Sequence, residues 1–232
     1  MTTEERTVAV PATVPKSVAI LGSTGSVGCQ TIDLLERNAS EYRVVALTAN
    51  SNVELLSEQA RLLRPQFVAI GDESCYGALK ANLSDTGIEV AAGPAAIEEA
   101  ANLNAEWVMA AIVGAAGLAP TLRAVQRGAV VALANKECLV CAGDLFMREV
   151  ARCNSKLLPV DSEHNAIYQV FDFERVEAIE KLILTASGGP FRDWQHEEMR
   201  IVTPSQAVAH PNWDMGAKIS VDSATMMNKG LE

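Results

Sequence analysis

The sequence has little positive charge. Its 19 lysine and arginine residues stand against 29 aspartate and glutamate residues, which gives a formal net charge of −10. Nucleic acids and anionic membranes are bound by basic surfaces, so the composition argues against both as partners. A phosphate group bound by such a protein must be held locally, by a helix N-terminus, a metal ion or a few placed lysine, arginine and histidine side chains.

Cysteine is scarce and long apolar runs are missing. Five cysteines, an odd number, do not suggest a disulfide framework and are compatible with a reducing cytoplasm. No apolar run approaches the length of a membrane-spanning helix, so no membrane association is expected. Residues 1–16 are polar and lack the apolar core of a signal peptide, and we interpret them as a flexible leader.

From residue 17 onward, short β-branched runs alternate with segments of helical periodicity. Such alternation is typical of βαβ units and predicts a parallel sheet. The expected strands cover residues 17–21, 42–49, 66–70, 88–92, 107–113 and 130–134, and the expected helices cover 31–38, 52–63, 73–83, 95–103 and 119–128. The prediction is a doubly wound, Rossmann-like α/β domain over residues 17–155.

Beyond residue 156, polar and small residues surround short apolar runs at residues 157–160 and 181–186, which we interpret as strands. The change predicts the beginning of a second domain, of α+β type, over residues 156–232. Because the sequence stops just after a Gly-Leu pair that could open a helix, we expect it to be truncated.

A glycine-rich turn, Gly22-Ser-Thr-Gly-Ser-Val-Gly28, separates the first expected strand from a helix. Its glycines permit a tight turn in which backbone N–H groups approach a pyrophosphate. Glycine-rich turns also serve packing alone. The position after the first strand of a doubly wound pattern nevertheless favours a dinucleotide site.

The second expected strand ends in polar residues without a carboxylate, at residues 48–52. Proteins that bind NAD usually place Asp or Glu here against the ribose 2′-OH, and that carboxylate would repel a 2′-phosphate. The sequence therefore favours NADP(H) over NAD(H). The same loop could cap the next helix, and the two roles are compatible.

The acidic pair of Asp161-Ser162-Glu163 follows the apolar run at residues 157–160. In extended geometry the two carboxylates would lie on one side, with Ser162 opposite. Two hard oxygen donors suit Mg²⁺ or Mn²⁺, and a third could come from elsewhere, such as Glu232. An isolated Asp-x-Glu is common, so a solvated turn is the alternative.

Two donor-rich segments could together hold a phosphate monoester. Residues 187–190, Ser-Gly-Gly-Pro, form either a backbone nest of N–H groups or a plain turn. The second segment contains Ser220, Ser223, Thr225, Asn228 and Lys229. Between them, residues 210–216 combine a histidine, a tryptophan and a glycine, which indicates either a lid or a surface loop.

Other features are interpreted as structural. Cys138-x-x-Cys141 has no second pair at zinc spacing and falls in an expected helix. His164 is expected to be hydrogen-bonded at a helix start rather than to bind metal, and His196 is expected to be solvated.

Taken together, six segments resemble the 1-deoxy-D-xylulose 5-phosphate reductoisomerase family: LGSTGSVG, MAAIVGAAGL, LANKECLV, LLPVDSEHNAIYQ, TASGGPFR and HPNWDMGAKISVDSATMMNKGLE. The resemblance implies an enzyme of isoprenoid biosynthesis that rearranges and reduces 1-deoxyxylulose phosphate to methylerythritol phosphate. It implies NADPH and a divalent metal ion, Mn²⁺, Mg²⁺ or Co²⁺, as cofactors, and a homodimer that extends beyond Glu232.

The resemblance also implies roles for individual residues. The expected catalytic residues are Lys136, Glu163 and His210, and the expected metal ligands are Asp161, Glu163 and Glu232. The cofactor would be bound by Thr24, Gly25, Ser26, Val27, Asn50, Ser51, Asn52, Asn135, Glu137 and Gly216. The substrate would be bound by Lys136, Ser162, Glu163, Ser187, His210, Trp213, Ser223, Asn228, Lys229 and Glu232, with its phosphate at Ser187, Ser223, Asn228 and Lys229.

Two residues depart from the family pattern: Cys138 replaces the usual serine, and Ser51 replaces a basic residue of some members, which would weaken the preference for NADP. Two rival functions remain open. A metal-independent NADP-linked dehydrogenase would stay active without divalent ions, and a nucleotide sensor would bind NADPH without turnover.

Overall fold

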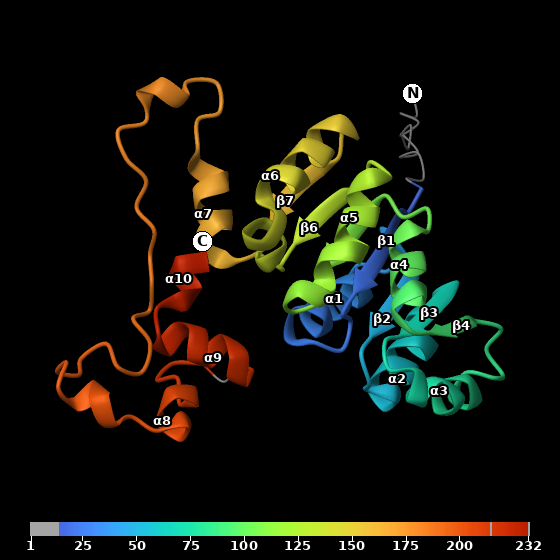
Figure 1. The fold of residues 1–232 in the computed structure, drawn as a ribbon. Coiled ribbons are helices and arrows are strands. Elements are labelled where there is room, and N and C mark those ends of the chain that lie inside the picture. Colours follow the sequence, from blue (N-terminus) through green and yellow to red (C-terminus); the bar gives the residue numbers. More distant parts are fainter. Residues whose placement is uncertain (1–13, 214, 232) are drawn as a thin grey trace, which may run out of the picture.

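A seven-stranded sheet forms the centre of the molecule in this computed structural model, which describes residues 14–213 and 215–231 (Figure 1). All neighbouring strands are parallel, in the order β4-β3-β2-β1-β5-β6-β7. The strands are β1 (Lys16–Leu21), β2 (Tyr42–Ala49), β3 (Phe67–Ile70), β4 (Glu89–Ala92), β5 (Trp107–Ala110), β6 (Val130–Leu133) and β7 (Lys156–Pro159). The predicted α/β fold is confirmed.

Helices cover both faces of the sheet. One face carries α1 (Ser26–Arg37), α2 (Val53–Leu63) and α3 (Tyr76–Asn82), and the other carries α4 (Pro94–Asn102), α5 (Leu118–Gln126) and α6 (Glu137–Arg152). Successive residues of β1 alternate between the two cores, with Ile20 packed under the first group and Leu21 under the second. Because both faces are buried, the strands are apolar at nearly every position rather than alternating.

The order of the strands reverses at β1. The chain runs outward from β1 through β2 and β3 to β4, and then returns to β5 on the other side of β1. Ligands of open α/β sheets bind at such a switch point, outside the carboxyl ends of the strands. The glycine-rich turn follows β1 at this place and begins with Gly22, whose φ is +87°. A Cβ atom on Gly28 would lie 2.2 Å from the Gly22 carbonyl oxygen, so α1 approaches the turn closely.

A smaller helical part lies beside the sheet (Figure 1). α7 (Ser162–Val170) follows β7 directly. A long connection then leads to α8 (Pro204–Val208), α9 (Ala217–Ala224) and α10 (Met227–Leu231), which lie together at its far end. No helix in the described part of the chain is both long enough and apolar enough to cross a membrane.

Two local predictions in this part are wrong. The strand expected at residues 181–186 is irregular, because none of the seven strands lies beside it to supply hydrogen bonds; Leu182 and Ile183 are 61% and 70% exposed. The extended geometry expected for residues 161–163 is replaced by a helix start, with Asp161 as the N-cap residue of α7. Glu163 in the first turn suits the positive end of the helix dipole.

The cysteines are all free. Cys138 and Cys141 both lie in α6, as predicted. Burial raises the pKa of the Cys138 thiol to about 11, so this side chain is a neutral, fully buried thiol at neutral pH. Such a thiol is a poor nucleophile, which supports its structural interpretation.

We expect Gly28→Ala to lower the free energy of unfolding by about 3 kcal/mol or more, because the new Cβ atom would collide with backbone atoms of Gly22 and Ser23. Urea unfolding followed by circular dichroism measures the change. Gly77→Ala is the matched control, since a Cβ atom in α3 meets nothing within 4 Å and alanine favours a helix by about 1 kcal/mol over glycine. Equal stability of the two variants would contradict the close approach of α1.

Candidate functional site

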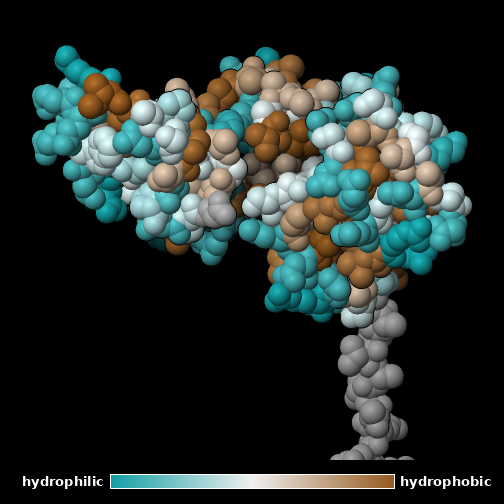
Figure 2. Space-filling model, turned by 90° about the horizontal axis from the view of Figure 1, so that it is seen from below, coloured by the Kyte–Doolittle hydropathy of each residue, from teal (hydrophilic) through white to brown (hydrophobic). Residues whose placement is uncertain are grey.

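A cavity of about 530 Å³ opens at the switch point of the sheet. It is walled by the first turn of α1, the segments that follow β5, β6 and β7, the turn at residues 186–188, and residues of α9 and α10. Figure 2 shows the hollow between the two parts of the molecule, with apolar side chains in its wall. The lining therefore draws on most of the chain length.

The first turn of α1 faces the cavity. Gly25, Ser26 and Val27 all line it, and the turn contains no acidic side chain. Gly25 is the N-cap residue and, as a glycine, has no side chain that could cap the helix amides. These N–H groups and the helix dipole are suited to hold a phosphate group. Thr24 belongs to the same turn but is not among the lining residues.

The polar loop after β2 lies next to the glycine-rich turn but outside the cavity lining. The end of β2 is joined to the glycine-rich turn by a hydrogen bond of 2.7 Å from Ser23 N to Thr48 O. Asn52 caps α2 by accepting a hydrogen bond of 3.1 Å from Leu55 N, as predicted for this loop. Asn50 and Ser51 complete the group at the carboxyl end of β2.

Asn135 lines the cavity and also holds its wall together. The side chain is 2% exposed, and its Nδ2 donates to the carbonyl oxygens of Ile112 and Gly114, the latter at 2.8 Å. Its Oδ1 accepts from Cys138 N at 3.0 Å. The amide thereby ties the segment after β5 to the beginning of α6.

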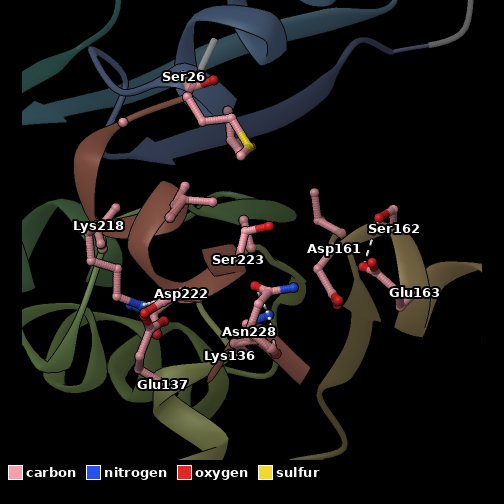
Figure 3. Close-up of a pocket in the computed structure, with 18 of the residues that line it drawn as sticks. Ser26, Lys136, Glu137, Asp161, Ser162, Glu163, Lys218, Asp222, Ser223 and Asn228 are labelled. Carbon is pink, nitrogen blue, oxygen red and sulfur yellow. Dashed lines mark hydrogen bonds and ion pairs between the residues drawn. The ribbon is translucent and has the colours of Figure 1, made fainter. Parts of the chain in front are cut away.

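The acidic pair lies at the N-terminus of α7 (Figure 3). Asp161 Oδ1 lies 2.7 Å from His164 Nδ1, so the hydrogen bond predicted for His164 at the helix start is confirmed. Asp161 Oδ2 is buried and has no hydrogen-bond partner within the described residues. An unpaired carboxylate oxygen at a cavity wall is suited to receive a cation.

Glu163 is engaged on both of its oxygens. Oε1 lies 2.6 Å from Lys229 Nζ, and Oε2 accepts a hydrogen bond of 2.8 Å from Ser162 Oγ. Partial burial alone would raise the pKa of the Glu163 carboxyl, but the hydrogen bonds from Lys229 and Ser162 outweigh it and hold the pKa below its ordinary value. Glu163 is therefore ionised at neutral pH.

The third predicted metal ligand, Glu232, lies outside the described residues. Across residues 14–213 and 215–231, no three acidic, histidine or cysteine side chains converge as a metal site. Two of the three expected ligands, Asp161 and Glu163, do face the same cavity.

A hydroxyl and imidazole network joins the other predicted substrate residues. Ser187 Oγ lies 3.1 Å from His210 Nε2 and 3.3 Å from Ser223 Oγ. His210 Nδ1 accepts hydrogen bonds of 3.2 Å from the backbone N–H groups of Asn212 and Trp213. Its proton therefore resides on Nε2, which donates to Ser187. Ser187 can in turn donate to Ser223.

Two glycines bring this network close to α9. Gly188 and Gly189 have φ values of +83° and +67°, and a Cβ atom on Gly189 would lie 2.5 Å from Ser223 O. The turn at residues 187–190 also directs Gly189 N to Ser187 Oγ at 3.2 Å. Residues 187–190 therefore form a tight turn that packs against α9. This geometry is compatible with both interpretations of the sequence, a nest of N–H groups and a plain turn.

The aromatic member of the predicted lid is open to solvent. Trp213 is 58% exposed and stacks on His210, with ring centroids 4.8 Å apart. Trp213 and Gly216 line the cavity, whereas His210 is not a lining residue and contacts two of them, Ser187 and Trp213.

A further contact joins the sheet to α10. Lys136 Nζ donates to Asn228 Oδ1 at 2.6 Å and to Asn228 O at 3.2 Å. In Figure 3 these two side chains and Ser223 lie between the acidic pair and a second charged group.

Two members of that second group, Lys218 and Asp222, were missed by sequence reasoning, whereas Glu137 was expected at the cofactor. Lys218 lines the cavity and forms ion pairs with Asp222, at 2.6 Å, and with Glu137. The spacing of Lys218 and Asp222 by four residues is a signal for a pair on one helix face. Nothing in the sequence indicates the contact with Glu137, 81 positions away.

The fold and the cavity define a doubly wound α/β protein whose ligand site combines a helix N-terminus, paired carboxylates and lysine side chains at the switch point. The chain belongs to the 1-deoxy-D-xylulose 5-phosphate reductoisomerase family. The model of that family matches residues 18–143, and the model of its C-terminal domain matches residues 157–232.

Individual relatives agree with the family. The 1-deoxy-D-xylulose 5-phosphate reductoisomerase of Rhodospirillum centenum is 64% identical over 217 residues, 94% of this chain and 54% of that protein. That of Caulobacter vibrioides is 56% identical over 95% of this chain and 55% of that protein. The chain spans about half the length of the curated relatives it matches.

Solved structures show the same similarity. The enzyme from Zymomonas mobilis in complex with NADPH has a TM-score of 0.88 and 51% identity, over 94% of this chain and 56% of the other. A DOX-P reductoisomerase in complex with NADPH, fosmidomycin and magnesium has a TM-score of 0.87 and 41% identity, over 93% and 56%.

We expect Asn135→Ala to lower the free energy of unfolding by about 2 to 3 kcal/mol, because it leaves a buried backbone group of residue 138 and partly buried backbone groups of residues 112 and 114 without their partner. Thermal unfolding measures the effect. Asn104→Ala, at an exposed position, is the control and should change stability by less than about 0.5 kcal/mol. An unchanged melting temperature for Asn135→Ala would argue that this amide serves only a ligand.

Proposed function

We propose that the protein carries out the NADPH- and divalent-metal-dependent rearrangement and reduction of 1-deoxy-D-xylulose 5-phosphate to 2-C-methyl-D-erythritol 4-phosphate. The observation that carries the proposal is the single cavity lined by the first turn of α1, the acidic pair and the donors of α9 and α10. Its relatives with NADPH and with magnesium support the same combination.

The cofactor half of the cavity belongs, apart from Gly216, to residues 17–155, which we assign as the NADPH-binding domain. The amides of Thr24, Gly25, Ser26 and Val27 would hold the pyrophosphate. Asn50, Ser51 and Asn52 would receive the 2′-phosphate without the repulsion of a carboxylate. Asn135, Glu137 and Gly216 would flank the nicotinamide end, where NADPH supplies the hydride that reduces an aldehyde.

The metal half belongs to residues 156–232, which we assign as the beginning of the catalytic domain. Asp161, Glu163 and Glu232 would hold a divalent cation, Mg²⁺, Mn²⁺ or Co²⁺. The unpaired Asp161 Oδ2 fits this role. When bound, such a cation polarises a carbonyl and stabilises the enolate-like charge of a rearrangement.

The charge of the cavity supports a cation as well. Among its described lining residues, the three lysines Lys136, Lys218 and Lys229 face the four carboxylates of Glu137, Asp161, Glu163 and Asp222. A sugar phosphate and NADPH are both anionic, so the excess of negative charge opposes them. A divalent cation reverses the balance. It would also replace Lys229 as the partner of Glu163, so that Lys229 could turn to the substrate phosphate.

The substrate would lie between these halves. Ser187, Ser223, Asn228 and Lys229 would bind its phosphate, and Lys136 and Ser162 its hydroxyl groups. Lys136, Glu163 and His210 are the proposed catalytic residues. Trp213, stacked on His210, would close the cavity and exclude water from the reacting atoms. We further propose a cytoplasmic protein that assembles as a homodimer.

Turnover tests the proposal directly. The protein is expressed at its full natural length and given 1-deoxy-D-xylulose 5-phosphate, NADPH and Mn²⁺, and NADPH oxidation is followed by absorbance. We expect oxidation that requires the sugar phosphate and stops when EDTA removes the metal. Oxidation that survives EDTA would indicate a metal-independent dehydrogenase, and NADPH binding without oxidation would indicate a sensor.

The metal site has its own test, which does not depend on activity. We expect Asp161→Asn to weaken Mn²⁺ binding at least about tenfold, measured by electron paramagnetic resonance of free Mn²⁺, because it removes a charged ligand oxygen. Asp85→Asn is the control: Asp85 is an exposed carboxylate that pairs with Arg61 outside the cavity. Equal Mn²⁺ affinity of both variants would contradict the assignment of Asp161.

A further inference from the structure

Lys218 and Asp222 line the cavity, yet no role has been assigned to either of them. We infer that Lys218 is a positioning residue for the substrate: by pairing with Glu137 and Asp222 it holds α9, and with it Ser223, against the cofactor half of the cavity. The inference rests on the proposed function and adds Lys218 to the residues that serve it.

The geometry joins two distant parts of the chain. Lys218 lies in the first turn of α9, and its ammonium group lies between Asp222, one turn further along the same helix, and Glu137, in the first turn of α6. Figure 3 shows the three side chains converging at one side of the cavity. Glu137 directly follows Lys136, and Ser223 directly follows Asp222. The ion pairs therefore connect the neighbours of two proposed substrate-binding residues.

The burial of the carboxylates makes this contact more than a surface ion pair. The side chains of Glu137 and Asp222 are 17% and 13% exposed, whereas Lys218 is 45% exposed. Exposed ion pairs contribute little to stability, because water screens them. Carboxylates that are this deeply buried need a partner, and both of them find it in one ammonium group.

The pKa shifts of Glu137 and Lys218 agree with their ion pair. Partial burial alone would raise the pKa of Glu137, but the hydrogen bond from Lys218 outweighs it and holds the pKa below its ordinary value. Burial alone would lower the pKa of Lys218, and the hydrogen bonds to Asp222 and Glu137 raise it instead. Both ion pairs of Lys218 are charge-assisted contacts.

The loss of Lys218 would act on the substrate in two ways. α9 would lose its tie to α6, so that Ser223 would no longer be held opposite Lys136. Two unpaired carboxylates would also remain in the wall of a cavity that receives anions. Both effects weaken the binding of the sugar phosphate more than they slow the chemistry of a bound molecule.

The test compares the KM values of variants of the protein expressed at its full natural length. We expect Lys218→Met to raise the KM for 1-deoxy-D-xylulose 5-phosphate about tenfold, with kcat lowered less than threefold and the melting temperature nearly unchanged. Asp222→Asn should raise the KM less, because Glu137 still holds Lys218. The double variant should be no worse than Lys218→Met, since the two residues act through the same contact.

Arg123→Met is the matched control. It removes one positive charge and one ion pair between two helices, Arg123 to Glu98, at a distance from the cavity lining. Its KM should be that of the unaltered protein. An unchanged KM for Lys218→Met would overturn the inference. So would a loss confined to kcat and melting temperature, which is the signature of a merely structural residue.

The inference and the proposed function fail in different ways. If the unaltered protein does not oxidise NADPH, the proposed function fails first. The tie itself is then tested by hydrogen exchange, in which the α9 amides should exchange faster in Lys218→Met than in Arg123→Met. Equal exchange in the two variants would overturn the inference without reference to turnover.

Discussion

Parallel pairing brings the carboxyl ends of all seven strands to one edge of the sheet, and the sheet side of the cavity depends on it. The segments that follow β1, β5, β6 and β7 meet there although more than 130 residues separate the first from the last. Each segment contributes a different chemical group. The helix N-terminus follows β1, the amide of Asn135 and the ammonium group of Lys136 follow β6, and the acidic pair follows β7.

The phosphate sites proposed for this acidic protein depend on positive partners that are local. The helix dipole of α1 needs no basic side chain. The three lysines of the cavity each lie close to a carboxylate or an amide oxygen. They therefore connect parts of the structure and also supply positive charge to the cavity. Asp161 differs from the other charged groups of the cavity, because one of its oxygens is buried without a hydrogen-bond partner among the described residues. A bound cation would supply that partner.

The sheet was predictable from the sequence because its strands are buried on both faces and its helices are periodic. β2 matches its expected bounds, and the others differ by one to three residues at an end. The acidic pair, the glycine-rich turn and the serines were found because each lies in a local motif. The Lys218–Glu137 contact was not, since it depends on how α9 packs against α6. The strand expected at residues 181–186 failed for a related reason: an apolar run predicts burial, but a strand exists only beside a partner.

The exposed apolar run at residues 182–184 affects how readily the chain self-associates in solution. Leu182, Ile183 and Leu184 expose apolar side chains to solvent, which favours self-association. The net charge of −10 opposes it, since like-charged molecules repel one another. Salt shortens the range of this repulsion to roughly 10 Å at 0.1 M, while the apolar side chains stay exposed. We therefore expect the chain to stay dispersed best in buffer of low ionic strength, where repulsion between its negative charges is least screened.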